Sequence, residues 1–320
     1  MEPRTVLPAH AGERGPRRIG LGLASLGRPG YLNVGHGEDL GEDRSVAALQ
    51  ARCFEVLDAA YAGGVRYLDA ARSYGRAEAF LGAWLDDRRP ADAVVGSKWG
   101  YVYTADWGVD ADPPEVKHHD VDTLRRQLDE TRARLGDRLA LYQIHSATPD
   151  SGVLESDAVL SELRALRATG VAIGVSVSGT SQPETIDRAV ELGCFDSVQA
   201  TWNLHERAAR EALRRAHAAG MAVLVKEALA NGRLTPRVRN PTLERAADAV
   251  RATVDAVALA AALAQPFADI VLSGVATREA LASNLAAAEL RLPDELLDGL
   301  AVLEEDSERY WAARSAMPWN

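Results

Sequence analysis

Short apolar runs alternate with longer amphipathic segments along the chain from residue 18 onward. The apolar runs are continuous, as expected of strands that are buried on both faces. Glycine recurs where a helix would end and the next strand begin, most clearly in residues 168–179, 191–202 and 218–229. The pattern predicts a βα repeat, in which parallel strands are joined by right-handed crossovers.

Eight of the apolar runs are predicted to be strands of one sheet. They are residues 19–24, 66–69, 93–97, 139–144, 171–177, 197–201, 222–225 and 270–273. The segments between them carry apolar residues at helical spacing, for example Leu124, Leu128 and Leu135. Eight strands alternating with helices predict an α/β fold, a closed (β/α)8 TIM barrel with parallel strands and outer helices.

We expect residues 1–320 to form a single barrel domain, because no proline- or serine-rich linker divides the chain. Residues 1–17 are expected to be a flexible N-terminal arm, and the polar residues 231–251 a loop over one barrel mouth. The alternative fold is an open doubly wound sheet, which needs a glycine-rich turn after its first strand. Residues 20–27 are only a near match to that turn, and the Arg-Pro-Gly-Tyr sequence that follows does not readily open a helix.

The composition is that of an ordinary globular protein, with 47% hydrophobic and 26% charged residues among 320. The 36 basic and 46 acidic residues give a formal charge of −10. This charge repels nucleic acids and anionic membranes, so neither is an expected partner. The longest apolar run, residues 256–264, is too short to span a bilayer, and the opening residues lack the apolar stretch of a signal sequence. We therefore expect a cytoplasmic protein, whose oligomeric state the sequence does not indicate.

The cysteines and the paired histidines do not indicate a metal site. Cys53 lies in a predicted helix and Cys194 follows a helix-ending glycine, and neither has a cysteine or histidine at metal-ligand spacing. Both are expected to be reduced, buried thiols. His118 and His119 lie in a polar loop without further candidate ligands, so we expect both to be solvated.

Ionisable residues lie at the ends of three neighbouring predicted strands, where barrel enzymes hold their reactive groups. Asp69 ends the second strand and is followed by Tyr74 five residues later. Lys98 follows the third strand and His145 the fourth. Each alone has a structural explanation, as a helix cap, a rim aromatic, a solvated cation or a strand-end histidine. Together they indicate chemistry, because an apolar strand gains nothing from ending in an ionisable side chain.

A phenol beside an ammonium is the chemistry that this set suggests. A free tyrosine titrates near pH ~10, and the ammonium of Lys98 is expected to stabilise the phenolate of Tyr74 and so lower its pKa. Asp69 would keep Lys98 charged and oriented, and His145 would either donate a hydrogen bond to a substrate oxygen or tune the phenol. None of these side chains supplies a hydride, so reduction needs a cofactor such as a nicotinamide. The residues expected to hold it follow the later strands and are Ser176, Ser178, Gln199, Lys226, Leu229, Asn231, Gly232 and Gly274.

The segment GGVRYLDAARSYGRAEAFLGAWL at residues 63–85 is similar to the signature of the aldo-keto reductases, G-x-x-x-x-D-T-A-x-x-Y-G-x-S-E-x-x-L-G. The GSKWG and LYQIH segments complete the likeness, which runs from residue 21 to residue 284. The resemblance implies that Tyr74 is the general acid, with Lys98 and Asp69 lowering its pKa, and that His145 orients the carbonyl. It also implies NAD(P)H-dependent reduction of a small aldehyde or ketone, or the reverse.

The cofactor residues of the aldo-keto reductases are matched in part. By resemblance, Ser176 and Gln199 are retained, whereas Val177 replaces the asparagine that binds the carboxamide. Ser178 is a candidate substitute for that asparagine. Lys226 stands where the family usually has an aromatic residue stacked on the nicotinamide, so it is expected to cover the ring or to contact a phosphate or the substrate.

The phosphate-binding segment is also similar, with Gly274 and Asn284 at the family's spacing. The arginine that often holds the 2′-phosphate of NADPH falls on Ala280, and Arg278 is the nearest alternative. Family habit predicts NADPH, with NADH as the other choice.

Aromatic residues follow Lys98 and recur near the end of the sequence, and they suggest a pocket for a flat or apolar carbonyl compound. The candidates for its wall are Trp99, Tyr101, Tyr103 and Trp107, with Tyr310, Trp311 and Trp319 as candidates either for the wall or for an apolar seal of the barrel mouth. The leading hypothesis is thus an oxidoreductase. The alternatives are a nicotinamide-binding redox sensor or auxiliary subunit with little turnover, and a lyase or isomerase with Lys98 as a Schiff-base amine.

Overall fold

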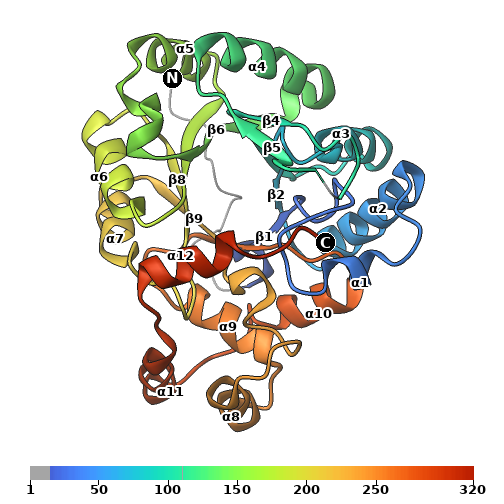
Figure 1. Cartoon of the computed structure of the whole chain (residues 1–320), viewed down its shortest axis with the longest axis vertical. Coiled ribbons are helices and arrows are strands. Elements are labelled where there is room, and N and C mark those ends of the chain that lie inside the picture. The colour runs from blue at the N-terminus through green and yellow to red at the C-terminus, as the bar shows by residue number, and fades with distance from the viewer. Residues whose placement is uncertain (1–14, 110) are drawn as a thin grey trace.

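Eight parallel strands close into a barrel in the computed structural model, which describes residues 15–109 and 111–320. The barrel strands are β1 (Ile19–Gly22), β2 (Tyr67–Asp69), β3 (Val94–Trp99), β6 (Leu139–Ala147), β7 (Ala172–Val177), β8 (Ser197–Thr201), β9 (Ala222–Lys226) and β10 (Ile270–Ser273). Their order around the barrel is β1-β10-β9-β8-β7-β6-β3-β2, so the first and last strands are neighbours and Ile19 pairs with Val271. A ring of helices surrounds them (Figure 1). The predicted (β/α)8 TIM barrel is confirmed, and each predicted strand overlaps an observed one.

A helix on the outside follows each barrel strand. In chain order these helices are α2 (Val46–Ala62), α3 (Ala77–Arg88), α4 (Val121–Leu135), α5 (Asp157–Ala168), α6 (Gln182–Leu192), α7 (Arg210–Ala218), α9 (Val254–Leu263) and α10 (Arg278–Ala286). The described residues also form α1 (His36–Leu40), α8 (Pro241–Val250), α11 (Asp294–Gly299) and α12 (Ser307–Ser315). The 3-10 helices are η1 (Pro16–Arg18), η2 (Gly136–Arg138), η3 (Pro149–Ser151), η4 (Val153–Glu155), η5 (Ala230–Gly232) and η6 (Leu300–Leu303). Of the expected N-terminal arm, residues 1–14 lie outside the described residues.

The helix α4 shows how local sequence sets the outer layer. The Asp120 side chain accepts a hydrogen bond from the backbone nitrogen of Thr123 (2.7 Å), which satisfies one of the free N–H groups at the helix start. Leu124 and Leu135 are buried at the helical spacing that the sequence predicts. Gly136, at φ 57°, ends the helix in a conformation that glycine adopts at least cost.

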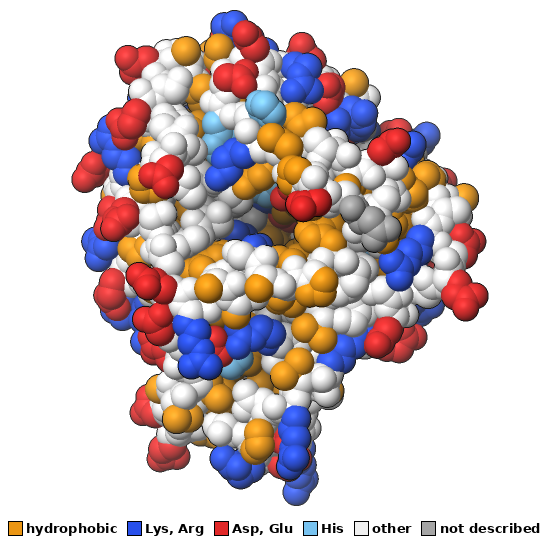
Figure 2. Space-filling model, in the orientation of Figure 1, with side chains coloured by type: hydrophobic (Ala, Val, Ile, Leu, Met, Phe, Trp, Pro, Cys, Tyr) orange, Lys and Arg blue, Asp and Glu red, His pale blue; other side chains and the backbone are white. Residues whose placement is uncertain are grey.

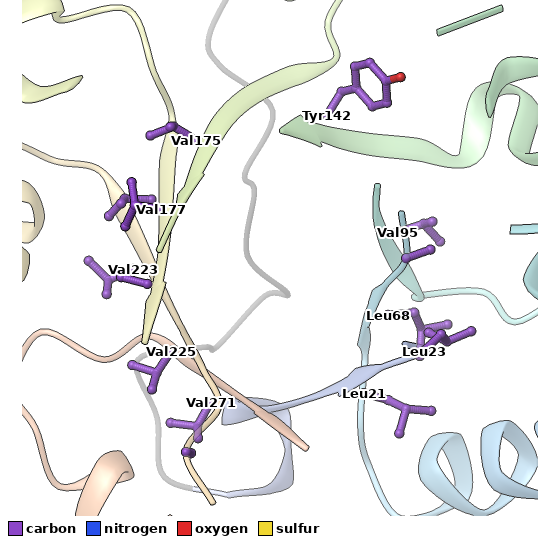
Figure 3. Packing of buried hydrophobic residues seen from close by; sticks show 14 of the residues in the cluster. Leu21, Leu23, Leu68, Val95, Tyr142, Val175, Val177, Val223, Val225 and Val271 are labelled. Atoms are coloured by element: carbon purple, nitrogen blue, oxygen red, sulfur yellow. The ribbon is translucent and has the colours of Figure 1, made fainter. Parts of the chain in front are cut away.

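Alternate residues of each strand belong to two cores. Leu68, Val95 and Val225 point away from the barrel axis and pack beneath the helices (Figure 3). Tyr67 and Leu224, each one position earlier, belong to a separate cluster of buried residues that fills the barrel interior. Full burial of a side chain such as Leu68 stabilises the fold by about 1.5–3 kcal/mol relative to exposure. The alternation also decides which strand residues reach the interior.

The prediction of a loop at residues 231–251 is wrong for its second half, which forms α8. The Asn240 side chain accepts a hydrogen bond from the backbone nitrogen of Leu243 (3.1 Å), and Pro241 takes the first helical position, where its missing N–H costs nothing. Leu243 is buried in a cluster with Val257 of α9. The segment forms a helix despite its polar composition, because its first turn is capped and one of its faces is apolar and buried.

A hairpin that the sequence did not predict stands beside the barrel mouth (Figure 1). It consists of the antiparallel strands β4 (Tyr101–Tyr103) and β5 (Glu115–Lys117), inserted between β3 and α4.

Within the described ranges, no helix combines the length and the apolar character needed to cross a bilayer.

Candidate active site

The four residues predicted for catalysis meet at one end of the barrel. Asp69 ends β2, Tyr74 lies between β2 and α3, Lys98 is in β3 and His145 in β6. The Lys98 ammonium forms an ion pair with Asp69, donates to the carbonyl oxygen of Ala70 (3.0 Å) and lies 3.5 Å from the Tyr74 hydroxyl oxygen. The rings of Tyr74 and His145 meet edge to face, with centroids 5.4 Å apart. A phenol hydroxyl thus lies close to both an ammonium and an imidazole.

Asp69 is held in place by two further donors. The Tyr67 hydroxyl donates to Asp69 Oδ1 (3.1 Å), and Gln199 Nε2 donates to the same oxygen (3.1 Å). The resemblance implies that Gln199 binds the cofactor amide, whereas in the structure its side chain donates to the carboxylate that pairs with Lys98. A buried carboxylate with three donors is rigidly oriented.

Burial sets the protonation of Tyr74 and His145. It raises the pKa of Tyr74 well above its usual value, and the Asp69 carboxylate raises this pKa further. The direction is the reverse of the predicted one, because desolvation of the phenolate and the nearby carboxylates outweigh the lowering of this pKa by the Arg28 cation. Burial, together with the Lys98 and Lys226 cations, holds the pKa of His145 well below its usual value. A protonated phenol and a neutral imidazole can both donate a hydrogen bond to one oxygen.

A cavity of about 690 Å³ lies over these groups, and Figure 2 shows the hollow near the centre of this face. Asp69, Tyr74 and His145 line it. The predicted cofactor residues that line it are Ser178, Gln199, Lys226, Leu229, Asn231, Gly232, Gly274 and Asn284. Of the predicted aromatic wall, Tyr101 and Trp311 line the cavity.

Trp99 and Trp107 do not line the cavity, contrary to the prediction. Trp99 shares the outward face of β3 with Val95, and both belong to the core beneath the helices. The strand alternation that turns Lys98 inward therefore turns Trp99 away. Trp107 packs edge to face against Phe80, with ring centroids 6.3 Å apart, and so covers α3 instead of the cavity.

Five more of the predicted cofactor and wall residues lie outside the cavity lining. One of them is Trp319, whose ring packs against the Arg28 guanidinium, 4.4 Å from the ring centroid. Ser176 is buried in β7, and its hydroxyl has no hydrogen-bond partner among the described residues. Arg278, the candidate for the 2′-phosphate, is the exposed first residue of α10. Tyr310 is buried and bonded to Asn203 (3.0 Å). Tyr103 is half-buried in the hairpin.

The expectation of two solvated histidines is wrong for His119. His118 is exposed, but His119 Nε2 lies 2.9 Å from the carbonyl oxygen of His145, and its ring meets that of Trp99 with centroids 5.7 Å apart. Burial lowers the pKa of His119 to about 4. The hairpin places this residue against the barrel, where it supports the backbone of His145.

Sequence reasoning missed Arg28, which follows the first strand and is almost fully buried. Its guanidinium lies 5.2 Å from the ring centroid of Tyr74 and 4.4 Å from that of Trp319. It also donates to Glu115 (3.1 Å) of the hairpin. The only local signal was an arginine directly after a strand-end loop, and that signal does not distinguish a buried cation from a solvated one.

Sequence reasoning also missed an ion pair on the β9 side of the cavity, between Glu227 and Arg314. Glu227, next to Lys226, accepts hydrogen bonds from Arg314 of α12 through both carboxylate oxygens (3.0 Å each from Nε). Arg314 and Lys226 hold the pKa of Glu227 at about 2, against the effect of burial. An acidic residue following Lys226 was a visible signal, but no local pattern connects it to an arginine 87 positions later.

Comparison with known proteins settles the family, because the profile of the Aldo/keto reductase family matches residues 18–304. This chain belongs to the aldo-keto reductases. Aldo-keto reductase str7 of Strobilurus tenacellus is 25% identical, over 90% of this chain and 88% of that protein. D-threo-aldose 1-dehydrogenase of a Pseudomonas species is 30% identical, over 61% of this chain and 62% of that protein.

Solved structures of aldo-keto reductases share the fold. One from Bacillus halodurans, in its holo form, superposes with a TM-score of 0.70 at 20% identity, covering 91% of this chain and 95% of that one. A Pseudomonas aeruginosa protein assigned to the same family gives 0.63 at 26% identity, covering 85% and 89%. Aldo-keto reductases are NAD(P)H-dependent oxidoreductases.

The cavity of this aldo-keto reductase fits a nicotinamide dinucleotide. It reaches Thr277 at the start of α10, where free N–H groups and the helix dipole favour a phosphate. A Cβ on Gly274 would meet open space, so the backbone there is free to approach a ligand. The Oδ1 atom of Asn231 is buried without a partner among the described residues and lies in a cavity-lining side chain.

Proposed function

We propose that this aldo-keto reductase reduces the carbonyl of a small aldehyde or ketone to an alcohol, or runs the reverse, with Tyr74 as the proton donor. The observation that carries the proposal is the Tyr74 hydroxyl, 3.5 Å from Lys98 Nζ and beside the His145 ring in the cavity. NAD(P)H supplies the hydride when bound.

Each residue of the set then has a defined task. Tyr74 is protonated because burial raises its pKa, so it can give a proton to a carbonyl oxygen that is gaining negative charge. Lys98 stabilises the phenolate left behind, and Asp69 keeps that ammonium in place. Neutral His145 donates a hydrogen bond to the same oxygen and orients it. In the reverse direction the phenolate accepts the proton.

The ion pair of Lys98 also bears on the Schiff-base alternative. An amine must be unprotonated to attack a carbonyl, whereas Lys98 is bound to Asp69 and to the Ala70 carbonyl as an ammonium. This arrangement favours the reductase over a lyase.

The residues across the cavity would hold the cofactor. Ser178 and Asn231 offer polar groups for the carboxamide and the pyrophosphate, while Gly274 and the start of α10 offer backbone N–H groups for a phosphate. Asn284, fully buried and bonded to Ser273 (2.9 Å), stiffens this segment.

We infer that the enzyme uses NADH at least as well as NADPH, which revises the preference that family habit predicts. Arg278 is exposed and outside the cavity lining. The α10 residues that do line it are Glu279, Ala280, Ser283 and Asn284, and none of them is a cation. A 2′-phosphate would therefore gain no salt bridge from this helix and would be repelled by Glu279.

The proposal is tested with Tyr74→Phe and a panel of aldehydes and ketones, following NAD(P)H oxidation. We expect kcat/KM to fall by about 10²–10⁴-fold, with the Kd for NAD(P)H, measured by fluorescence, almost unchanged. Tyr61→Phe is the matched control, because that hydroxyl bonds the exposed Asp92 (2.7 Å) outside the cavity lining.

Near-native turnover by Tyr74→Phe would show that another group donates the proton. Tight NAD(P)H binding by the wild type without turnover of any carbonyl on the panel would instead support the redox sensor.

A further inference from the structure

Lysine is rare in this chain and is confined to the region of the barrel mouth. Of the 36 Lys and Arg residues, three are lysines: Lys98, Lys117 and Lys226. Lys98 pairs with Asp69, and Lys117 of β5 donates to the carbonyl oxygen of Ser146 (2.9 Å). The exposed ion pairs of the described surface use arginine as the base. A lysine at position 226 is therefore unusual in a protein whose basic residues are almost all arginines.

Lys226 points into the cavity, and no described residue forms an ion pair with it. It shares the inward face of β9 with Leu224 and lines the cavity. Glu227, the adjacent carboxylate, is occupied by Arg314. Among the residues that the structure describes, no carboxylate lies within ion-pair distance of the Lys226 ammonium.

The neighbouring cations of the inner cavity, in contrast, are compensated. Lys98 is bound by Asp69, and Arg28 by Glu115. In the described part of the cavity wall around Tyr74, Lys226 is thus the cation that remains to be paired. A buried charge without a counter-ion costs free energy that a ligand of opposite charge recovers.

The charge of Lys226 acts where a carbonyl would bind. Burial lowers the pKa of Lys226 to about 8; Arg314 and Lys98 lower it too, while Glu227 and Asp69 raise it. The side chain is still mainly an ammonium at neutral pH. It is close enough to His145 to lower the pKa of that imidazole. In the barrel order, β9 stands opposite β3, so Lys226 faces the Lys98 side of the mouth.

We propose that Lys226 binds a carboxylate of the substrate, and that the enzyme acts on carbonyl compounds that carry an acid group. The carbonyl oxygen lies at Tyr74 and His145, and the acid group reaches across the cavity to the Lys226 ammonium, outside the proton-transfer pair. Tyr101 and Trp311 line the same cavity. The inference rests on the carbonyl chemistry proposed above and names the substrate class for that site.

The first test compares an acid with its neutral ester at constant carbonyl chemistry. The substrates are 4-carboxybenzaldehyde and its methyl ester, together with succinic semialdehyde and its methyl ester. We expect Lys226→Met to lower kcat/KM about 10–100-fold for the acids, as for loss of a hydrogen bond to a charged group, and to change the esters by less than about threefold. Lys226→Arg should retain most of the selectivity for the acids. Lys117→Met, the matched control, should leave the acid-to-ester ratio unchanged.

The second test measures binding without turnover. With three lysines in the chain, the acylation rate of each amine by an activated ester can be followed by mass spectrometry of its peptide. We expect 4-(hydroxymethyl)benzoate to slow the acylation of Lys226, whereas its methyl ester should not. Lys117 should react at the same rate with and without the carboxylate.

The outcomes separate this inference from the proposed function. Equal losses for acid and ester in Lys226→Met, or a matching loss of NAD(P)H affinity, would show that Lys226 serves the cofactor or the fold and would overturn the inference. If the wild type turns over no carbonyl, the proposed function is wrong. The acylation test then still decides whether Lys226 binds a carboxylate, and absence of protection would overturn that as well.

Discussion

The two sides of the barrel mouth hold their charges in different ways. On the side of β2 and β3, the Asp69–Lys98 pair is buried between strands and its groups are fully bonded. On the side of β9, Glu227 is bonded by Arg314 from a helix far along the chain, and Lys226 has no ion-pair partner among the residues that the structure describes. A site that must repeat one proton transfer needs fixed groups, whereas a site that must admit a ligand needs a charge still to be satisfied.

The largest effect is expected from Lys98→Met, which breaks the fixed side. It leaves the buried Asp69 carboxylate without its cation, so we expect a loss of about 3–5 kcal/mol in the free energy of unfolding, together with a large fall in kcat/KM. Urea unfolding followed by circular dichroism measures the first. The double variant Asp69→Asn/Lys98→Met should recover part of the stability, and no recovery would mean that the ion pair is not what the single change breaks.

Glu227→Gln is expected to have the next largest effect. The folded-state pKa of Glu227, about 2, lies below its ordinary value, so this carboxylate stabilises the fold above the ordinary pKa and that contribution is lost as the pH falls toward 2. The contribution is on the order of 3 kcal/mol at neutral pH. The variant should be less stable at pH 7 and lose less stability between pH 5 and pH 2 than the wild type. Parallel pH profiles of unfolding for the two proteins would contradict this.

Ala280→Arg sharpens the comparison on the cofactor side. An arginine here would face the cavity beside Ser283 and could pair with a 2′-phosphate, so we expect the ratio of NADPH to NADH affinity to rise about tenfold, or ~1.4 kcal/mol. Fluorescence titration with each cofactor measures the ratio. Glu279→Gln is the companion variant, with a smaller shift in the same direction. An unchanged ratio in both would place the 2′-phosphate elsewhere.

The smallest effect is expected outside the mouth, from Glu155→Ala. Its exposed pair with Arg188 is solvated and screened, although the atoms lie 2.7 Å apart. The urea midpoint should not move measurably. A clear loss of stability would mean that burial is not what separates the strong pairs of this protein from the weak ones.

The barrel could be predicted because its information is local and repeated. Continuous apolar strands, helical stripes and glycine stops recur in each βα unit, so an error in one unit does not change the fold. The error at α8 arose where proline and polar residues resembled a loop, although Asn240 caps a helix there.

The grouping of the four candidate catalytic residues could be predicted because they follow strand ends and include a compact motif around Asp69 and Tyr74. The remainder of the site could not. Trp99 was placed on the wrong side because an adjacent position was treated as sharing the face of Lys98. The pKa of Tyr74 was predicted in the wrong direction, since the degree of burial depends on residues from distant parts of the chain that surround the ring. The Glu227–Arg314 contact depends on how α12 lies across the barrel. The residues next to Glu227 and Arg314 in the sequence do not indicate that placement.

The pairing of β1 with β10 has a consequence for folding during synthesis. During synthesis, a nascent chain that has emerged through residue 226 contains seven of the eight barrel strands. The open sheet then has an unpaired strand at each edge, β1 and β9. The gap can be filled only when residues 270–273 emerge. A nascent chain stalled between residues 226 and 270 should therefore be prone to self-association. Extension of the chain by a few dozen residues should abolish that tendency.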